Sequence, residues 1–428
     1  MLCVVFDTRF LERGTQQHRT SSLFHPVIPI PSCSANSSPR TRNGHVLEGL
    51  QWRHRSFIAS LRMGQASWCR LSTHHSGEFL LIISTAINRS CLRLGRLWPT
   101  TQLVVKAYDP DTKQTTLRSI NVSNFAPCDD KRSSKSDQFT VSHKSTLGGE
   151  FEESYSILGR FGDDFQVSVD IKRPSAIPGF KIGKGPKGGF SYFGRNVEKP
   201  KGYVVHRFWP RFHSSGIVVN NSRATSFTGP GMFVHAIQGM RPNLVASSWN
   251  FAHFQSDEHG GVSAIQMELT TIDTYGKKGE GSGKVVVNVG SLVVGGKLAA
   301  VTAETKWPGE PVADKPPVLS RAVHHDKSLD SFTGYDVPST ITFHWAGPSV
   351  VAGVEGNLSA DLSVEVGKPG KEIGLIEKVD VLAEIPGFVK AVVNYVAGAK
   401  PYIYQVCFPI ISFSRPLTII FSGSTPRR

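Results

Sequence analysis

Cysteine is scarce in the body of this sequence. Between residues 99 and 405 only Cys128 occurs, and the other five cysteines lie in the first 98 residues or near the C-terminal end. The six cysteines form no CxxC pair and none of the Cys/His spacings of zinc sites. This scarcity argues against a disulfide framework and against a bound metal, and it is typical of proteins in a reducing compartment.

Long hydrophobic runs are lacking as well. MLCVVF (1–6) is too short for the hydrophobic core of a secretory signal peptide. FLLII (79–83) is far below the ~20 residues that a membrane-spanning helix needs. The sequence therefore predicts neither a signal peptide nor a membrane span.

Lysine is missing from the first part of the chain, and positive charge is unevenly distributed. The net charge is +14, but residues 1–98 have twelve Arg and four acidic residues, and residues 406–428 have three Arg and no acidic residue. The segment between them has a net charge of only +3. Because a nucleic-acid-binding surface needs basic residues clustered on the folded body, we expect no nucleic-acid partner.

The two ends also differ from the middle in composition. Residues 1–76 are rich in Ser, Arg, His and Pro and show no sustained hydrophobic period, and residues 406–428 form an irregular tail. We interpret both as atypical segments, disordered or mispredicted in the gene model. A basic targeting arm is the alternative for the first segment. Arg89, Arg93 and Arg96 would then lie on one face of a short amphipathic helix, although the same residues also fit a β-strand.

Alternation of apolar and polar residues dominates the middle. It occurs in DDFQVSVDIKRP (163–174), in STITFHWAG (339–347) and in GNLSADLSVEVGK (356–368). A period of two residues predicts strands with one dry face and one solvated face. Gly295-Gly296 and YDPDTKQ (108–114) are expected hairpin turns between such strands.

One helix is expected, near the end of this region. Pro386 precedes GFVKAVVNYVAG (387–398), and Pro401 follows a terminal glycine. A short helix after many strands is the layout of a lipocalin-like barrel, and about 300 residues can hold two barrels of about 150 residues. The predicted fold is all-β: two tandem lipocalin-like (calycin) antiparallel β-barrels, at 77–228 and 229–405, with a short C-terminal helix.

Several nucleotide and metal motifs occur only in incomplete form. Gly183 to Gly188 matches GxGxxG, but Pro186 interrupts it and a strand-like aromatic run follows it, so a dinucleotide site is not expected. GEGSGKV (279–285) has Val285 where a phosphate loop needs Ser or Thr. His324-His325-Asp326 lies in a connector and is interpreted as a solvated loop. We therefore expect no cofactor and no metal.

Two strand-like segments combine aromatic residues with His, Gln and Arg: GYVVHRFWPRF (202–212) and FVHAIQGMRPNLVASSWNFAHFQS (233–256). Each polar group buried without a partner costs ~1–3 kcal/mol, so such residues persist where they pair or surround a cavity for a ligand head group. A barrel wall whose polar groups are satisfied by neighbours is the alternative. The candidate ligand-binding residues are His206, Trp209, Arg211, His235, Gln238, Arg241, Trp249, His253 and Gln255.

The second segment can present only one of its two faces to a ligand. In a strand, Trp249, Phe251, His253 and Gln255 share one face, and Asn250, Ala252, Phe254 and Ser256 share the other. We favour the Trp249 set as the face that touches ligand, and we expect Asn250 to act mainly on stability.

From about Trp98 to Gln405 the chain resembles the fungal survival-factor proteins, named for survival under oxidative stress. The motifs that carry the resemblance are GFSYFG, HRFWPR, GPGMFVHAIQGMRPNLVASSWNFAHFQS, VGGKLAAVTAETKWPGE, TGYDVPSTITFHWAGPS and GLIEKVDVLAEIPGFVKAVVNYVAGAKPYIYQ. The resemblance implies two lipocalin-like domains and non-vesicular transport of ceramide from the endoplasmic reticulum to the Golgi. It also implies a cytoplasmic protein peripherally attached to these secretory-pathway membranes, with the nucleus as a further location.

We therefore expect a lipid-binding protein without catalysis, whose ligand is ceramide or a similar lipid. Burying each methylene group contributes ~0.8 kcal/mol, so a long acyl chain needs a deep apolar interior. The main alternative is a hydratase or isomerase acting on a terpenoid, with Glu268 or His235 as proton donor. A stress-linked scaffold with filled barrels is a third possibility.

Overall fold

The structure is a computed structural model of the chain, and all the regular elements among the residues it describes are β-strands. It describes residues 2–7, 63–72, 80–93, 96–109, 113–130, 132–181, 190–193, 202–238, 246–257, 260–271, 286–306, 319–352, 355–380, 402–408 and 418–422. Within these ranges the all-β prediction is confirmed. The helix expected after Pro386 lies outside the described residues.

The chain divides into two compact units. Unit 1 consists of Met1–Ser32, Ser191–Tyr203 and Pro242–Arg428, and unit 2 consists of Cys33–Phe190 and Val204–Arg241. The domain boundaries expected from the sequence, at residues 76, 228 and 405, stay predictions.

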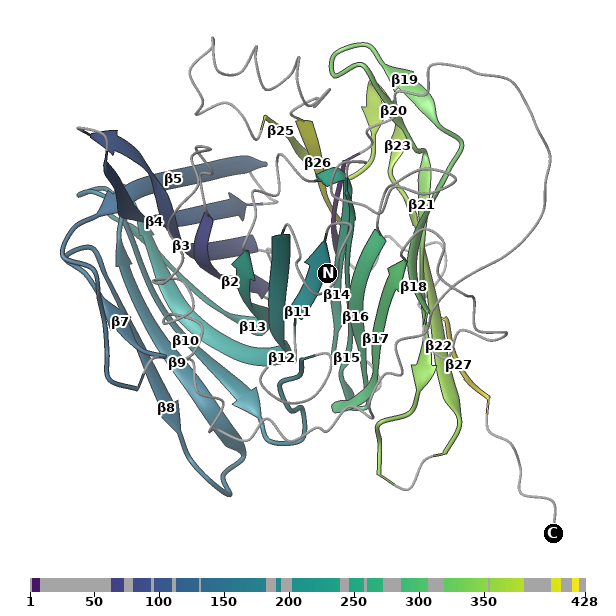
Figure 1. The fold of residues 1–428 in the computed structure, drawn as a ribbon, viewed down its shortest axis with the longest axis horizontal. Helices are drawn as coiled ribbons and strands as arrows, with labels where there is room; N and C mark the ends of the chain where they lie inside the picture. Colours follow the sequence, from purple (N-terminus) through teal and green to yellow (C-terminus); the bar gives the residue numbers. More distant parts are fainter. Residues whose placement is uncertain are drawn as a thin grey trace. The chain divides into compact units, whose positions relative to one another are not determined.

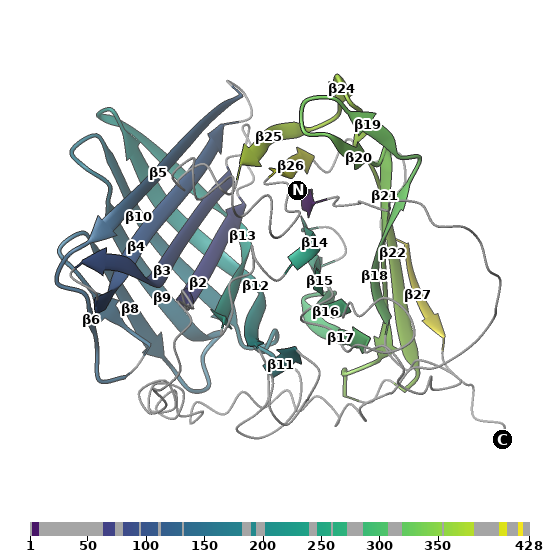
Figure 2. The ribbon, with the colours of Figure 1, turned by 45° about the horizontal axis from the view of Figure 1, so that its top comes forward.

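Unit 2 is built on one antiparallel sheet with the strand order β5-β4-β3-β2-β13-β12-β10-β9-β8-β7-β6. Figure 2 shows it as a strongly curved layer. Over the described residues the order runs from β5 to β6 without closing, so the predicted closed barrel is not seen there. The strands are β2 (Met63–Ser72), β3 (Leu80–Arg93), β4 (Arg96–Asp109), β5 (Gln114–Val122), β6 (Ala126–Pro127), β7 (Ser134–Lys135), β8 (Phe139–Ser145), β9 (Phe151–Arg160), β10 (Phe165–Pro174), β12 (Gly202–Asn220) and β13 (Arg223–Gln238).

One face of this sheet carries the apolar core of unit 2. Along β10 the side chains alternate between buried and exposed, with Phe165, Val167, Val169 and Ile171 buried. Buried residues of the neighbouring strands pack with them, among them Leu103, Val105, Phe139, Ile157, Phe212 and Val218. The alternation predicted for residues 163–174 is confirmed, because burial follows the period of two that a half-buried strand requires.

Unit 1 contains two main sheets, whose strands are labelled in Figure 1, and the two-stranded sheets β19-β20 and β23-β24. The larger has the order β17-β16-β15-β14-β1-β26-β25, and the smaller has the order β18-β21-β22-β27. Their strands are β1 (Leu2–Asp7), β14 (Ala246–Ser256), β15 (Val262–Thr271), β16 (Val286–Val294), β17 (Lys297–Lys306), β18 (Leu319–His325), β21 (Thr340–Pro348), β22 (Asn357–Glu365), β25 (Leu375–Asp380), β26 (Tyr402–Phe408) and β27 (Thr418–Ser422). The strands of the two-stranded sheets are β19 (Ser328–Asp330), β20 (Tyr335–Val337), β23 (Gly367–Lys368) and β24 (Lys371–Glu372), and the short strand β11 (Phe190–Phe193) pairs with β12.

The two sheets of unit 1 pack against each other through a shared core. Ala252 and Phe254 of β14 belong to the same buried cluster as Phe343 and Trp345 of β21. The indole Nε1 of Trp345 donates a hydrogen bond of 2.9 Å to the main-chain oxygen of Ile265 on β15, which ties the sheets together. The predicted alternation in β21 and β22 is confirmed by their burial.

The predicted turns are present. Gly295 and Gly296 join β16 to β17 with φ values of 59° and 68°, a region that favours glycine. The segment YDPDTKQ joins β4 to β5. Arg89 and Arg93 lie in β3 and Arg96 in β4, so these arginines form strands and not an amphipathic helix.

The atypical ends contribute strands where the structure describes them. In residues 1–76 these are β1, which pairs with β14 and β26, and β2, which pairs with β13 and β3. In residues 406–428 they are the end of β26, and β27, which pairs with β22. That these segments are disordered or mispredicted stays a prediction.

Candidate functional site

Three of the predicted ligand-binding residues lie on β12 in unit 2, and all three are buried: His206, Trp209 and Arg211. His206 and Trp209 point to opposite faces because they are three residues apart in a strand. On the face of His206, the neighbouring Phe208 stacks on Phe180 with 5.1 Å between the ring centroids. Burial lowers the pKa of His206 to about 4, so the ring is neutral at physiological pH.

Trp209 belongs to an aromatic group on the inner face of the unit 2 sheet. Its ring centroid lies 5.2 Å from that of Tyr155 and 5.3 Å from that of Phe233, and those two lie 5.4 Å apart. The guanidinium carbon of Arg173 lies 5.8 Å from the Trp209 ring, which is the geometry of a cation–π contact.

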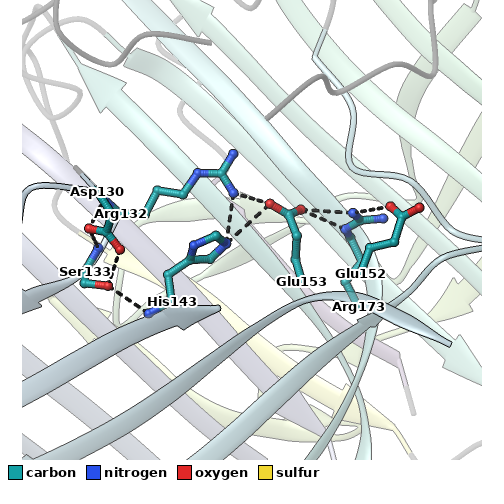
Figure 3. A network of polar contacts seen from close by, with 7 residues as sticks. All are labelled: Asp130, Arg132, Ser133, His143, Glu152, Glu153 and Arg173. Carbon is teal, nitrogen blue, oxygen red and sulfur yellow. Dashed lines mark hydrogen bonds and ion pairs between the residues drawn. The ribbon is translucent and has the colours of Figure 1, made fainter. Parts of the chain in front are cut away.

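A charged group adjoins these aromatic rings (Figure 3). We call it the Glu153 cluster, and it consists of Arg132, His143, Glu152, Glu153 and Arg173. Arg173 donates from Nε to Glu153 at 3.0 Å and from Nη2 to Glu152 at 3.0 Å. Arg132 donates to the other oxygen of Glu153. The Nε2 atom of His143 lies 3.0 Å from Arg132 Nη1 and 3.4 Å from the same carboxylate oxygen.

The Glu153 cluster holds its central carboxylate ionised. Burial by itself raises the pKa of Glu153, but the contact with His143 and the charges of Arg132 and Arg173 outweigh this effect and lower the pKa to about 2. Both carboxylate oxygens have cationic partners, and Arg173 also donates to the main-chain oxygen of Ile177 at 3.2 Å. The buried charges therefore neutralise one another within the cluster.

The segment that follows β10 lies close against the edge of Trp209. A Cβ atom added to Gly179 would come within 2.9 Å of Trp209 Cδ1 and 3.2 Å of the Phe208 main-chain oxygen. Such distances are shorter than side chains tolerate, so this approach requires glycine. The aromatic group is thus fixed from the sheet and from this segment together.

Sequence analysis missed the Glu153 cluster, although a signal for it exists. Arg173 continues the inward series of Phe165, Val167, Val169 and Ile171 by one more step. A charged residue at an inward position predicts a charged partner, because an isolated buried charge is very unfavourable. Glu153 occupies an inward position of the adjacent strand and is directly paired with Arg173.

The other predicted residues divide between the units. Trp249, His253 and Gln255 lie on β14 in unit 1. His253 and Gln255 are buried and hydrogen-bonded to each other, with 2.6 Å between Nε2 atoms. Because an amide nitrogen can only donate, Nε2 of His253 is the acceptor. Ser263 donates to Gln255 Oε1 at 2.6 Å.

His235 and Gln238 lie on β13 in unit 2, and their side chains are outside the described part of the structure, as is Arg241 altogether.

The opposite face of β14 carries a second polar group, which we call the Asn250 network. Asn250 Nδ2 donates to one oxygen of Glu268 at 2.9 Å, and Asn288 Nδ2 donates to the other at 3.0 Å. The Nε2 atom of His324, on the smaller sheet, lies 2.8 Å from Asn250 Oδ1. Burial, with the charges of Lys327 and His325, lowers the pKa of His324 to about 4. The ring is therefore neutral and donates this bond.

The register of β14 and β15 agrees with the two faces expected from the sequence. Trp249 is paired with Leu269 and Asn250 with Glu268, so the Trp249 set and the Asn250 set are on opposite sides of the larger sheet. Which set contacts a ligand stays a prediction.

The described residues contain no group of three His, Cys, Asp or Glu side chains placed to hold a metal ion. They also contain no helix with the length and hydrophobicity of a membrane span.

Comparison with known proteins identifies related sequences. A family model described as the Svf1 family matches residues 92–414. The ceramide-binding protein svf1 of Aspergillus fumigatus is 34% identical over 275 residues, which is 64% of this chain and 59% of that protein. The protein of that name from Debaryomyces hansenii is 35% identical, over 60% of this chain and 57% of its own length. The protein of that name from Schizosaccharomyces pombe is 30% identical over 74% of this chain and 72% of its own length. The chain thus spans less than three fifths of the first two relatives.

Solved structures give only weak likenesses. A putative AttH from Nitrosomonas europaea has a TM-score of 0.41 at 13% identity and covers 74% of this chain and 95% of its own. Kievitone hydratase from Nectria haematococca has a TM-score of 0.39 at 10% identity, and the match covers 75% of this chain and 80% of the hydratase. Neither value assigns a fold or an activity, so the tandem lipocalin-like barrels stay a prediction.

Proposed function

The chain belongs to the Svf1 family, and on this basis we propose that it binds ceramide. The observation that carries the proposal is the family match over residues 92–414, together with relatives that are named as ceramide-binding proteins. The chain covers only part of those relatives, so the ligand is inferred for this chain and not transferred with the family.

The structure supports this proposal through its apolar sheet faces. Each unit buries a contiguous set of aliphatic and aromatic side chains along one face of a sheet, and polar groups lie among them. A ceramide has two long hydrocarbon chains and a small neutral polar end. Each buried methylene contributes ~0.8 kcal/mol, so most of the affinity would come from apolar contact and the selectivity from a few polar groups.

We further propose that the protein acts as a carrier, moving ceramide from the endoplasmic reticulum to the Golgi without vesicles. In this role it attaches peripherally to secretory-pathway membranes and supports survival under oxidative stress. The resemblance of the motifs between Trp98 and Gln405 to the survival-factor proteins is the support for this finer proposal.

Binding without turnover fits the surroundings of Glu268 better than catalysis does. Both of its oxygens accept hydrogen bonds from asparagine side chains, at 2.9 and 3.0 Å. A general acid must instead present a proton to the substrate. We therefore propose a binding protein and not a terpenoid hydratase or isomerase.

The test is native mass spectrometry of the full chain purified from its own cells, followed by a liposome assay with fluorescent ceramide. We expect a co-purifying lipid of sphingoid mass, transfer of ceramide between liposomes, and no chemical change in the lipid. A protein without bound lipid that neither binds nor transfers ceramide contradicts the proposal. Conversion of a terpenoid would support the enzyme instead.

A further inference from the structure

Three neutral polar side chains on one face of the larger sheet of unit 1 have atoms without hydrogen-bond partners. Within the described structure these atoms are Nε2 and Oε1 of Gln266, Oγ1 of Thr302 and Oδ1 of Asn288. The side chains of Gln266 and Thr302 are 0% exposed and that of Asn288 is 1% exposed. A buried polar atom without a partner is unfavourable, and nearly all such atoms in folded proteins are satisfied by protein, water or ligand. An amide with both ends unsatisfied therefore indicates a missing partner.

The three side chains lie on one face of the larger sheet. Gln266 of β15 is paired with Gly290 of β16, and Gly290 is paired with Thr302 of β17. Asn288 precedes Gly290 by two residues and is on the same face. This is the face that packs toward the smaller sheet, because Ala264 and Leu292 belong to the core shared by both sheets. It is the face of Asn250 and not the Trp249 face that the sequence favoured for the ligand, because Ala252 is paired with Gln266.

Small residues separate the polar groups in this row. Gln266 is flanked by Ala252 on β14 and by Gly290 on β16. Gly290 has no side chain, and neighbouring strands are ~4.8 Å apart, so Gln266 and Thr302 face each other across about 10 Å of sheet with only a glycine between them. A group that contacts both side chains would lie over Gly290.

The surroundings fix the orientation of the polar groups. The amide nitrogen of Asn288 is used by Glu268 at 3.0 Å, so Asn288 presents its oxygen as an acceptor. Trp345, from the smaller sheet, donates to the main-chain oxygen of Ile265, the residue before Gln266. Apolar residues continue the face on the other side of the row, with Ala264, Leu292 and Ala300 directly paired.

We infer that Gln266, Thr302 and Asn288 form the binding site for the amide and hydroxyl groups of a ceramide, which we call the Gln266 site. The inference rests on the proposed function and names the residues that would carry it. Gln266 offers two N–H donors and a carbonyl acceptor, Thr302 offers a hydroxyl, and Asn288 offers a carbonyl acceptor. Ceramide brings an amide N–H, an amide carbonyl and two hydroxyls, so donors and acceptors match on both sides.

The chemistry of the site selects a neutral ligand with donors of its own. The unpartnered groups carry no charge, and the nearby carboxylate of Glu268 is occupied by two asparagine amides. A phosphorylated head group would have no cation to pair with among these residues. A diacylglycerol has a hydroxyl but no amide N–H, so it leaves Asn288 Oδ1 or Gln266 Oε1 without a donor and binds less tightly.

The experiment compares two variants with a matched control. Gln266→Leu and Thr302→Val remove unpartnered groups at nearly constant volume. Ser291→Ala is the control, because Ser291 is also 0% exposed with an unpartnered Oγ, but it follows Gly290 and points to the opposite face. For each full-length variant the dissociation constants of a fluorescent short-chain ceramide and of the matching diacylglycerol are measured, together with the thermal midpoint.

We expect Gln266→Leu to weaken ceramide binding ~10-fold or more, Thr302→Val to weaken it several-fold, and Ser291→Ala to leave it unchanged. The preference for ceramide over diacylglycerol should shrink in the first two variants. Their thermal midpoints should not fall, because removing an unsatisfied buried polar group is not destabilising. If Gln266→Leu fails to fold, the ceramide affinity of Thr302→Val, compared with that of Ser291→Ala, tests the site.

The two proposals fail in different ways. If the wild-type protein binds ceramide and both variants bind it equally well, the Gln266 site is wrong and buried water satisfies these atoms, while the proposed function stands. If the wild-type protein itself binds no ceramide, the proposed function fails and the inference falls with it.

Discussion

The Glu153 cluster of unit 2 and the Gln266 site of unit 1 are both polar groups on otherwise apolar inner faces, but their chemistry is opposite. The first is charged, and both oxygens of its central carboxylate have cationic partners. The second is neutral, and four of its side-chain atoms have no partner in the described structure. The first should therefore act on stability and the second on binding.

The role of a buried polar group can be inferred from whether its hydrogen-bonding atoms already have partners. Taking charges out of water is expensive, and a buried ion pair persists only when its geometry and hydrogen bonds offset that penalty. Such a group has nothing left to offer a ligand. A neutral amide or hydroxyl costs less to bury, so it can remain unpaired until a ligand supplies its hydrogen bonds. Residue type alone does not separate these cases, and hydrogen-bond satisfaction does.

The largest expected effect comes from Glu153→Ala. It leaves Arg173, which is 2% exposed, without its buried partner. Breaking one side of a buried ion pair typically costs about 3–5 kcal/mol of unfolding free energy. Denaturant unfolding of the purified variant measures the loss, and ceramide binding by the fraction that remains folded should be unchanged.

Glu152→Ala is the matched control for that variant. Glu152 contacts the same arginine at 3.0 Å, but its side chain is 42% exposed. An exposed ion pair contributes about 0–1 kcal/mol, so the loss should be small. Equal losses in both variants would show that burial does not set the energetics of the Glu153 cluster.

Acid should destabilise the protein in two windows. The pKa values of His206 and His324 are about 4 in the folded state, below the ordinary value of about 6.5, so from pH 6.5 down to about 4 the unfolded chain takes up protons that the folded chain resists. Stability falls over that window by up to about 1.4 kcal/mol per pH unit for each histidine. The pKa of Glu153 is lowered to about 2, so its contribution is present above pH 4.5 and is lost between pH 4.5 and 2.

Urea unfolding at a series of pH values measures this dependence, with His206→Phe as the test variant. Removing this ring should reduce the dependence between pH 6.5 and 4 to the part that His324 contributes, and it should leave the part below pH 4 unchanged. An unaltered slope in the upper window would show that His206 is protonated inside the folded protein.

Glu268→Gln tests whether the Asn250 network binds or catalyses. One carboxylate oxygen becomes an NH₂ group that faces an asparagine NH₂ group, so one hydrogen bond is lost at about 1–3 kcal/mol of stability. Ceramide transfer between liposomes should change less than 10-fold. An enzyme that uses this acid would lose ~10²-fold or more in rate. Glu365→Gln, an exposed carboxylate on β22, is the control and should change neither quantity.

Local sequence pattern was sufficient for the strands but not for the polar contacts. The alternation of Phe343 and Trp345, and of Leu358 and Leu362, predicted the inner faces that the structure shows, because side-chain direction in a strand follows from position alone. Whether Gln266 finds a hydrogen-bond partner depends on the register between the consecutive strands β14, β15 and β16, and the alternation within one strand does not fix that register. Hydrogen-bond satisfaction follows from that register and could not be predicted from a single segment.

The candidate ligand-binding residues could likewise be predicted by residue type but not by their contacts. His253 and Gln255 were chosen for their residue type, and the structure pairs them with each other and with Ser263. Gln266 lies on the next strand in a segment that reads as an ordinary buried strand, VSAIQMELTT, and nothing in its local pattern marks it. Its place in the proposed site follows from the register that sets Gly290 and Thr302 beside it.

The smallest expected effect comes from Tyr155→Phe, which tests whether unit 2 takes part in ligand binding. The ring of Tyr155 contacts Trp209 and Phe233, and burial raises the pKa of its hydroxyl, which therefore stays neutral. In the described structure that hydroxyl makes no hydrogen bond to protein. Removing it should therefore change the unfolding free energy by less than about 0.5 kcal/mol. Tyr155→Ala removes the whole ring and should lower the unfolding free energy by about 3–5 kcal/mol. Ceramide affinity measured on Tyr155→Phe should equal that of the wild type. If it falls several-fold while stability is kept, a polar group of the ligand contacts Tyr155, and the binding role moves from the Gln266 site to the aromatic group of unit 2.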